Sequence, residues 1–351
     1  MSKVILKAEE LDGYLTSADL SSLKQLDLIF NKALEIFPKI QEGKSDAHAS
    51  LITVYNDIEI LLHEICRINP RLHVFSLTSQ AEDISEISRL IAKLRNVHTE
   101  NNEFVYYIQR SYEIIFKLAY LRPFSEKNHF IVKTPVVSPA QNYAVHKFIN
   151  TDENIKNAVM CVMLRGALLP SMIISKEIEE HSSDNFVTPF ALFKIYRSDN
   201  KQENNMEYIL DLDKSYFNFD SLNGKDLIFA DPMNATGGSM VTVVNYLIKN
   251  GVKPRSVAFL NVISALKGAL RVIRALENCN VYTLWMDSTL NKNAYIMPGL
   301  GDAGDRINGC EDESNPRDIS QLLADFGSVI SNQYRSQFNE IERTINTGNK
   351  I

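Results

Sequence analysis

The chain has 351 residues, of which 45% are hydrophobic, so it can build one large domain or two smaller ones around a substantial core. Its 37 basic and 43 acidic residues give a net charge of −6, which argues against a general binder of nucleic acid or of anionic membranes. The four cysteines are far apart and suit a reducing compartment, and neither a secretory signal nor an apolar run of about 18 residues is apparent. We therefore expect a folded cytoplasmic protein that binds neither nucleic acid nor a membrane.

Amphipathic patterns predict that the first hundred or so residues are mainly helical. One apolar face covers residues 23–37 and ends before Pro38, and a second covers residues 51–65. Two further helices are predicted over about 84–94 and 104–121. These patterns predict a helical extension before the segments described next.

Short apolar runs then alternate with helical patterns. The runs that predict strands are residues 130–137, 158–164, 190–196, 227–230, 256–263 and 281–286. Alternation of strands and helices, with strands that are apolar on both faces, predicts a parallel sheet covered by helices. In such sheets ligands bind beyond the carboxyl ends of the strands, so we expect the chemistry in the loops that follow these runs. The seven histidines show no metal-ligand spacing, which argues against a zinc site.

The string DPMNATGGS, residues 231–239, joins a strand-like run to an apolar helix predicted to begin near Met240. Backbone N–H groups around paired glycines form a concavity that binds anions, and the start of a helix adds a favourable dipole. The string is neither a P-loop nor a dinucleotide-binding fingerprint, so it indicates a different phosphorylated ligand. From these residues alone, a plain strand-to-helix turn with Ser239 as the helix N-cap remains an alternative.

A second string, AYIMPGLGDAGDRINGC, covers residues 294–310. The glycines and the proline between Pro298 and Asn308 predict neither a regular helix nor a central strand, but a close-packed loop whose backbone can approach a flat ligand. A structural glycine-rich loop is the alternative from this string alone.

Both strings, in this order, resemble those of the uracil phosphoribosyltransferase family. The resemblance implies a type I phosphoribosyltransferase fold, in which helices flank a parallel sheet and a small hood covers the site. It also implies that uracil contacts Ile296, Gly301, Asp302 and Ala303, and that Asp231 and Asp302 are the catalytic residues. The residues implied to bind 5-phosphoribosyl 1-diphosphate (PRPP) are Arg165, Arg197, Asp231, Pro232, Met233, Asn234, Ala235, Thr236, Gly237, Gly238, Ser239 and Asp302.

The implied reaction converts uracil and PRPP to UMP and diphosphate, with Mg²⁺ bound mainly through PRPP rather than directly by the protein. Uracil and PRPP are then the small-molecule partners, self-association into a dimer or larger oligomer is expected, and an allosteric nucleotide is left open. The resemblance covers residues 73–311, so residues 1–72 are expected as a helical extension and residues 312–351 as a helical tail. Within the matching part, residues 130–137 are expected to form an edge strand of the sheet.

The chain departs from the family pattern at several places. Gly166 and Ala167 are exchanged, Asn234 replaces a leucine, Asn308 replaces an aromatic residue, and the loop at residues 263–268 differs from the usual one. These departures keep an alternative open, namely a catalytically weak or inactive paralogue that serves as a nucleotide sensor or a scaffold through its added helices. A different base specificity also remains open.

Overall fold

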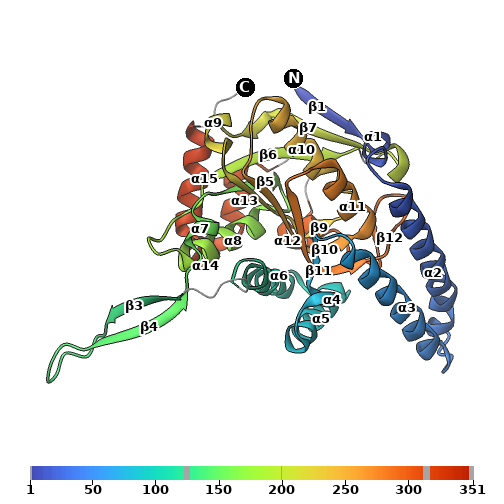
Figure 1. The fold of residues 1–351 in the computed structure, drawn as a ribbon, viewed down its shortest axis with the longest axis horizontal. Coiled ribbons are helices and arrows are strands. Elements are labelled where there is room, and N and C mark those ends of the chain that lie inside the picture. The colour runs from blue at the N-terminus through green and yellow to red at the C-terminus, as the bar shows by residue number, and fades with distance from the viewer. Residues whose placement is uncertain (1, 122–126, 199, 311–316, 348–351) are drawn as a thin grey trace.

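The computed structural model describes residues 2–121, 127–198, 200–310 and 317–347. A nine-stranded central sheet has the order β1-β7-β6-β5-β8-β10-β11-β2, with β9 paired to β10 (Figure 1). Its strands are β1 (Lys3–Lys7), β2 (Leu72–Val74), β5 (Ala158–Leu164), β6 (Phe190–Arg197), β7 (Glu207–Tyr216), β8 (Asp226–Ala230), β9 (Met233–Asn234), β10 (Ser256–Ala265) and β11 (Cys279–Asp287). The strands from β6 to β2 run parallel, whereas β7 and β1 pair antiparallel at one edge.

Helices cover both faces of this sheet, which explains why its central strands are mainly apolar. Every residue of β5 and of β8 is buried. Helix α8 (Leu168–His181) packs on β5 and against α6 (Asn101–Phe116), while α10 (Gly238–Lys249) packs against α11 (Leu266–Ala275). Because β6 and β10 lie on opposite sides of the β5–β8 pair, right-handed crossovers place α8 and α10 on opposite faces. The expected α/β fold with a helix-covered parallel sheet is confirmed.

The residues before the family-like region contribute strands as well as helices. Strand β1 is followed by α1 (Ala8–Asp12), α2 (Ser17–Gln41) and α3 (Ala47–Arg67), and then by β2. The prediction that the first apolar face ends before Pro38 was wrong by one turn, because α2 continues to Gln41. Pro38 has no N–H to donate to the carbonyl oxygen four residues earlier, yet the helix continues for three residues beyond it. The helical prediction missed β1, whose side chains alternate between exposed and partly buried.

Residues 130–133 form a strand as predicted, but the expectation that the run at residues 130–137 is an edge strand of the sheet was wrong. Strand β3 (Lys127–Lys133) pairs with β4 (Tyr143–Ile149) in a separate two-stranded ribbon, which extends away from the rest of the protein in Figure 1. Ile131 and Val145 lie opposite each other on this ribbon and are both more than half exposed. The apolar run thus reflects an exposed ribbon rather than a buried edge strand.

The remaining elements follow the order of the chain. They are α4 (Phe75–Thr78), α5 (Ala81–Arg95), the π-helical turn η1 (Lys117–Leu121), α7 (Asp152–Ile155), the 3₁₀ turn η2 (Glu203–Asn205), α9 (Phe219–Leu222), β12 (Thr289–Leu290), β13 (Ile296–Met297), α12 (Ala303–Asn308), α13 (Ile319–Asp325), α14 (Gly327–Gln333) and α15 (Arg335–Thr347). The helical tail is therefore observed over residues 319–347. No helix among the described residues is long and apolar enough to cross a membrane.

The strand order creates a crevice at the carboxyl ends of two central strands, β5 and β8. From β5 the chain moves outward to β6, whereas from β8 it moves the other way to β10 and β11. The loops that follow β5 and β8 therefore diverge at the carboxyl ends of two adjacent strands, which is where α/β proteins bind ligands.

Candidate active site

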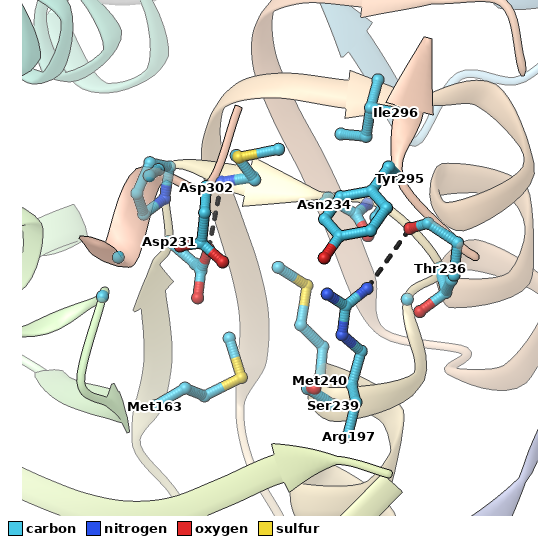
Figure 2. Close-up of a pocket in the computed structure, with 18 of the residues that line it drawn as sticks. Met163, Arg197, Asp231, Asn234, Thr236, Ser239, Met240, Tyr295, Ile296 and Asp302 are labelled. Atoms are coloured by element: carbon cyan, nitrogen blue, oxygen red, sulfur yellow. Dashed lines mark hydrogen bonds between the residues drawn. The ribbon is translucent and has the colours of Figure 1, made fainter. Parts of the chain in front are cut away.

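A cleft of about 280 Å³ occupies this crevice. One wall is the loop at residues 231–239, which we call the phosphate loop, and the other is the segment at residues 294–304, which we call the hood. Figure 2 shows side chains from both walls facing the space between them. The structure thus brings together the two strings that the sequence singled out.

The phosphate loop is fixed by small residues that pack against neighbouring elements. Helix α10 begins at Gly238, and its N-cap is Gly237, whose φ of +74° disfavours any residue with a side chain. A Cβ on Gly237 would lie 2.6 Å from the carbonyl oxygen of Gly268, and a Cβ on Gly238 would overlap the ring of Tyr208. The alternative in which Ser239 is the N-cap is therefore wrong, because Ser239 lies inside the helix.

Two carboxyl groups lie beside each other in the cleft. Asp231 follows β8 and accepts a 3.0 Å hydrogen bond from the backbone N–H of Met233, and Asp302 approaches it from the hood (Figure 2). Burial raises the pKa of Asp231 to about 6, and the negative charge of Asp302 acts in the same direction. The pair therefore favours a ligand that brings positive charge or hydrogen-bond donors to this corner.

Arg197, at the end of β6, spans the cleft from below. Its guanidinium donates a 3.2 Å hydrogen bond to the carbonyl oxygen of Ala294, and it lies 5.7 Å from the centre of the Tyr295 ring (Figure 2). This places a permanent positive charge between the phosphate loop and the hood, as an anionic ligand requires.

Arg165 lies beside the cleft rather than in it. Its guanidinium forms an ion pair with Asp305 and donates a 2.5 Å hydrogen bond to the carbonyl oxygen of Gly309. Its neighbour Gly166 lines the cleft, whereas Arg165 is not among the lining residues. In this arrangement the Arg165 guanidinium is directed at Asp305 and Gly309.

The hood is held by charged side chains that bind backbone groups. Asp287, at the end of β11, accepts a 3.0 Å hydrogen bond from the N–H of Gly299 and pairs with Arg95 at 2.6 Å. Arg306 donates a 2.8 Å hydrogen bond to the carbonyl oxygen of Leu300 and also bonds the carbonyl of Leu94 in α5. These contacts fix both ends of the glycine-rich segment.

The expectation of a continuous loop between Pro298 and Asn308 was wrong in its second half. Residues Ala303–Asn308 form the short helix α12, and Asp302 is its N-cap, accepting a 3.0 Å hydrogen bond from the N–H of Asp305. The helix forms although Gly304 is inside it, because the Asp302 cap and the contacts of Arg306 supply local stabilisation. The first half is a loop, with positive φ at Gly299 and Gly301.

Asn234 is the unusual residue of the phosphate loop. Its side chain is 2% exposed, and neither atom of its amide finds a hydrogen-bond partner among the described residues. It lines the cleft, and its Oδ1 would lie 2.9 Å from a Cβ placed on Gly268. A buried amide without partners is costly to a protein, so this position is either strained or completed by a ligand or by water.

Most of the sequence-predicted residues meet at the cleft. The predicted residues that line it are Arg197, Asp231, Pro232, Met233, Asn234, Ala235, Thr236, Gly237, Ser239, Ile296, Gly301, Asp302 and Ala303. Gly238 is buried behind the loop, and Arg165 lies outside. The lining residues that the prediction missed are Met163, Gly166, Ile195, Tyr196, Met240, Ala294, Tyr295 and Gly304. Several of these are sequence neighbours of predicted residues, so their position beside a motif was the signal that could have identified them.

Comparison with known proteins decides the family. The family model described as uracil phosphoribosyltransferase matches residues 82–310, which is well over half of the chain. This chain belongs to the uracil phosphoribosyltransferase family. Membership places it among the phosphoribosyltransferases, which are pentosyltransferase enzymes.

Individual proteins are also similar to parts of this chain. A uracil phosphoribosyltransferase of Ureaplasma urealyticum is 30% identical over 184 residues, which are 52% of this chain and 77% of the relative. Uridine kinase-like protein 4 of Arabidopsis thaliana is 25% identical over 277 residues, covering 77% of this chain and 51% of that protein. A solved structure of an Aquifex aeolicus protein is 20% identical and covers 64% of this chain and 94% of its own, with a TM-score of 0.47.

Proposed function

We propose that the protein transfers the 5-phosphoribosyl group of PRPP to uracil, forming UMP and diphosphate. The observation that carries this proposal is the joint placement of the phosphate loop and the hood on opposite walls of one cleft. An anion-binding loop at the start of α10 suits a phosphate, while the glycine-rich hood lets backbone groups approach a planar base. The sugar phosphate of a nucleotide would thus contact the phosphate loop, and its base would contact the hood.

In the proposed reaction the bond between C1′ and the diphosphate oxygen breaks and a bond from C1′ to N1 of uracil forms, while N1 loses its proton. Residues Thr236 to Ser239 would hold the 5′-phosphate, and Arg197 would stabilise the charge that grows on the departing diphosphate. Asp231 would bind the ribose hydroxyls, and Asp302 would accept a hydrogen bond that helps uracil lose its proton. Most of the catalytic effect would come from positioning.

Magnesium is proposed as the cofactor, bound mainly through PRPP. The described residues contain no group of three or more His, Cys, Asp or Glu side chains that could hold a metal alone. The neighbouring carboxyl groups of Asp231 and Asp302 suit an ion that takes one or two carboxylates and completes its shell with substrate phosphates. A bound cation would also relieve the repulsion that helps to raise the pKa of Asp231.

A direct assay tests the proposal. Purified protein is mixed with labelled uracil, PRPP and Mg²⁺, and the labelled nucleotide is separated and counted. We expect UMP to form only when all three are present, and its formation to stop when PRPP is replaced by ribose 5-phosphate. No nucleotide at high protein concentration would overturn the catalytic claim, and formation of a nucleotide from another base alone would change the assigned substrate.

The ion pair of Arg165 with Asp305 favours a second candidate, a family member that binds a nucleotide without turnover. The unpartnered amide of Asn234 in the phosphate loop favours the same candidate. Calorimetry distinguishes the two, since a sensor binds PRPP or UMP with measurable heat yet yields no product in the assay above.

Self-association of two copies through the β3–β4 ribbon is also proposed. The apolar side chains of Ile131 and Val145 are 67% and 61% exposed and lie opposite each other on this ribbon, and exposed apolar side chains that adjoin one another are typical of protein–protein contacts. Changing both to lysine should shift the mass measured by light scattering to that of one chain. The matched control is Ile52→Lys on α3, which alters an equally exposed apolar residue elsewhere. An unchanged mass in the double variant would contradict the proposal.

A further inference from the structure

A buried cluster of charges lies directly behind the phosphate loop. Its centre is Arg271 in α11, whose side chain is 0% exposed. The guanidinium lies 2.7 Å from Asp12 Oδ1 and 2.8 Å from Glu203 Oε1, and Lys267 pairs with the same Glu203 at 2.9 Å. Two cations and two anions therefore balance one another around the buried guanidinium, while the side chains of Asp12 and Lys267 stay 35% and 23% exposed.

The cluster touches the phosphate loop itself. Arg271 Nη1 lies 3.4 Å from the carbonyl oxygen of Thr236 and donates to it. One turn earlier, Gly268 is so close to Ala235 that a Cβ there would lie 2.5 Å from the Ala235 carbonyl oxygen. The phosphate loop thus packs against helix α11. A displacement of Arg271 would alter the hydrogen bond that the Thr236 carbonyl oxygen accepts.

One of the two anions comes from far away in the chain. Asp12 lies 259 positions before Arg271, at the end of α1, and outside the residues that the family model matches. It is brought there because β1 pairs with β7 and because the N–H of Ala8 donates to the carbonyl oxygen of Met206, next to η2. The N-terminal segment is therefore bound to the same sheet edge that carries Glu203.

We infer that residues 3–12 form a positioning segment for the phosphate loop. Asp12 and Glu203 hold the Arg271 guanidinium in one orientation, and Arg271 in turn holds the Thr236 carbonyl so that the neighbouring N–H groups face the ligand. A planar guanidinium needs partners on more than one side to be fixed, and both acids are required for that. Arg271 and Asp12 are positioning residues, since neither lines the cleft.

This inference rests on the proposed function only in assigning a phosphorylated sugar to the loop. Its prediction is selective: loss of Asp12 weakens binding of the 5-phosphoribosyl group and leaves the hood, and hence the base, unaffected. Coupling through such a network changes affinity by about threefold to thirtyfold.

The structure offers a matched control on the same helix. Arg274, one turn after Arg271, pairs with Asp19 at 2.8 Å and bonds Asn69 at 2.7 Å. Asp19 is 5% exposed and also comes from the N-terminal extension, but Arg274 is held by residues of that extension rather than by the phosphate loop. Asp19→Asn therefore removes a comparable buried ion pair without touching the loop.

The experiment compares the unaltered chain with Asp12→Asn and Asp19→Asn. Binding of ribose 5-phosphate is measured by calorimetry, thermal stability by melting, and KM for PRPP and for uracil by the product assay. We expect both variants to melt earlier, but only Asp12→Asn to weaken ribose 5-phosphate binding and to raise KM for PRPP by about threefold to thirtyfold, with KM for uracil unchanged. Asp12→Glu, which keeps the charge, should recover part of the loss.

The outcomes separate the inference from the proposed function. Equal affinities in Asp12→Asn and the unaltered chain, or equal losses in both asparagine variants, would overturn the positioning role while the proposed function stands. If the unaltered chain binds ribose 5-phosphate but makes no UMP, the reaction fails and the positioning role is still decided by the affinities. If it binds no phosphoribosyl ligand, both fail. Should Asp12→Asn not fold, Asp12→Asn combined with Lys267→Met keeps the cluster neutral and is judged by the same affinities.

Discussion

The two walls of the cleft are stabilised by different interactions. The phosphate loop is held by close packing, because Gly237, Gly238 and Gly268 leave no room for a side chain between the loop, α11 and the Tyr208 ring. The hood is held by charged side chains, chiefly Asp287 and Arg306, that bind its backbone groups. Added volume should therefore cost the phosphate loop most of its folding stability, whereas lost charge should cost the hood most.

The largest effect is expected on the hood from Asp287→Ala. The 3% exposed carboxylate pairs with Arg95 and accepts from the N–H of Gly299, so its removal leaves a charge and a donor without a partner. We expect the free energy of unfolding, measured with urea, to fall by about 3–5 kcal/mol. Asp287→Asn keeps an acceptor for Gly299 and should cost less. Equal small losses in both variants would show that charge does not hold the hood.

On the opposite wall, Gly238→Ala should fail through volume. Its new methyl group would overlap the Tyr208 ring, which is fully buried and cannot move aside without repacking. We expect a loss of about 2–3 kcal/mol in the free energy of unfolding, measured by urea titration. Gly166→Ala is the matched control, because its methyl group would meet the nearest atom at an ordinary 3.5 Å. A similar loss in both would mean that crowding at Tyr208 is not the cause.

The contrast between the walls also explains what the sequence could predict. The phosphate loop and the hood were recognised because each is a continuous string whose residue types are dictated locally, by backbone approach and by helix capping. Asp12, Glu203 and Arg271 carry no such signal, since they meet only through the pairing of β1 with β7. Arg165 was expected in the cleft from its place after β5, but its direction depends on Asp305, 140 positions later.

Secondary structure shows the same division. Central strands such as β5 and β8 were predicted correctly because burial on both faces makes them apolar, apart from Asp226 at the start of β8. The run at residues 130–137 is also largely apolar, but the β3–β4 ribbon that contains its first part is exposed, so its pairing could not be predicted from the run alone. Helix α12 was missed because Gly304 inside it disfavours a helix. The helix depends instead on the Asp302 cap and on contacts that Arg306 makes with residues distant in the sequence.

Asp231 lies where the two walls meet, and its titration tests how they interact. Its pKa of about 6 in the folded protein lies above the ordinary value of 3.8, so between these two values the unfolded chain loses a proton that the folded chain keeps. Stability therefore falls as the pH rises from 4 to 6 and stays reduced above 6. Asp231→Asn removes this effect, and its melting temperature relative to the unaltered chain should rise over the same interval, by an amount equivalent to about 2 kcal/mol.

The titration of Asp231 should also affect the use of PRPP, but here a rise in pH is favourable, whereas it lowers stability. The proposed contact with ribose hydroxyls or with the metal uses the carboxylate, so kcat/KM for PRPP should fall as the pH drops below about 6 in the unaltered chain. If the relative stability of Asp231→Asn does not change between pH 4 and 7, the carboxyl group has an ordinary pKa in the folded protein, and burial does not raise it.

The smallest effect, and the most specific to this chain, is expected at Asn234, the polar exception in the packed wall. Because neither atom of its amide finds a partner among the described residues, Asn234→Leu should raise the free energy of unfolding by about 1 kcal/mol. Asn261→Leu is the control, since that buried amide donates a 2.8 Å hydrogen bond to the carbonyl oxygen of Asp231 and its loss should destabilise. Destabilisation by both would mean that the Asn234 amide is bonded in solution, through water, and that the phosphate loop relies on polar contacts as the hood does. A gain in stability with unchanged UMP formation would instead show that the Asn234 amide contributes neither to folding nor to the reaction.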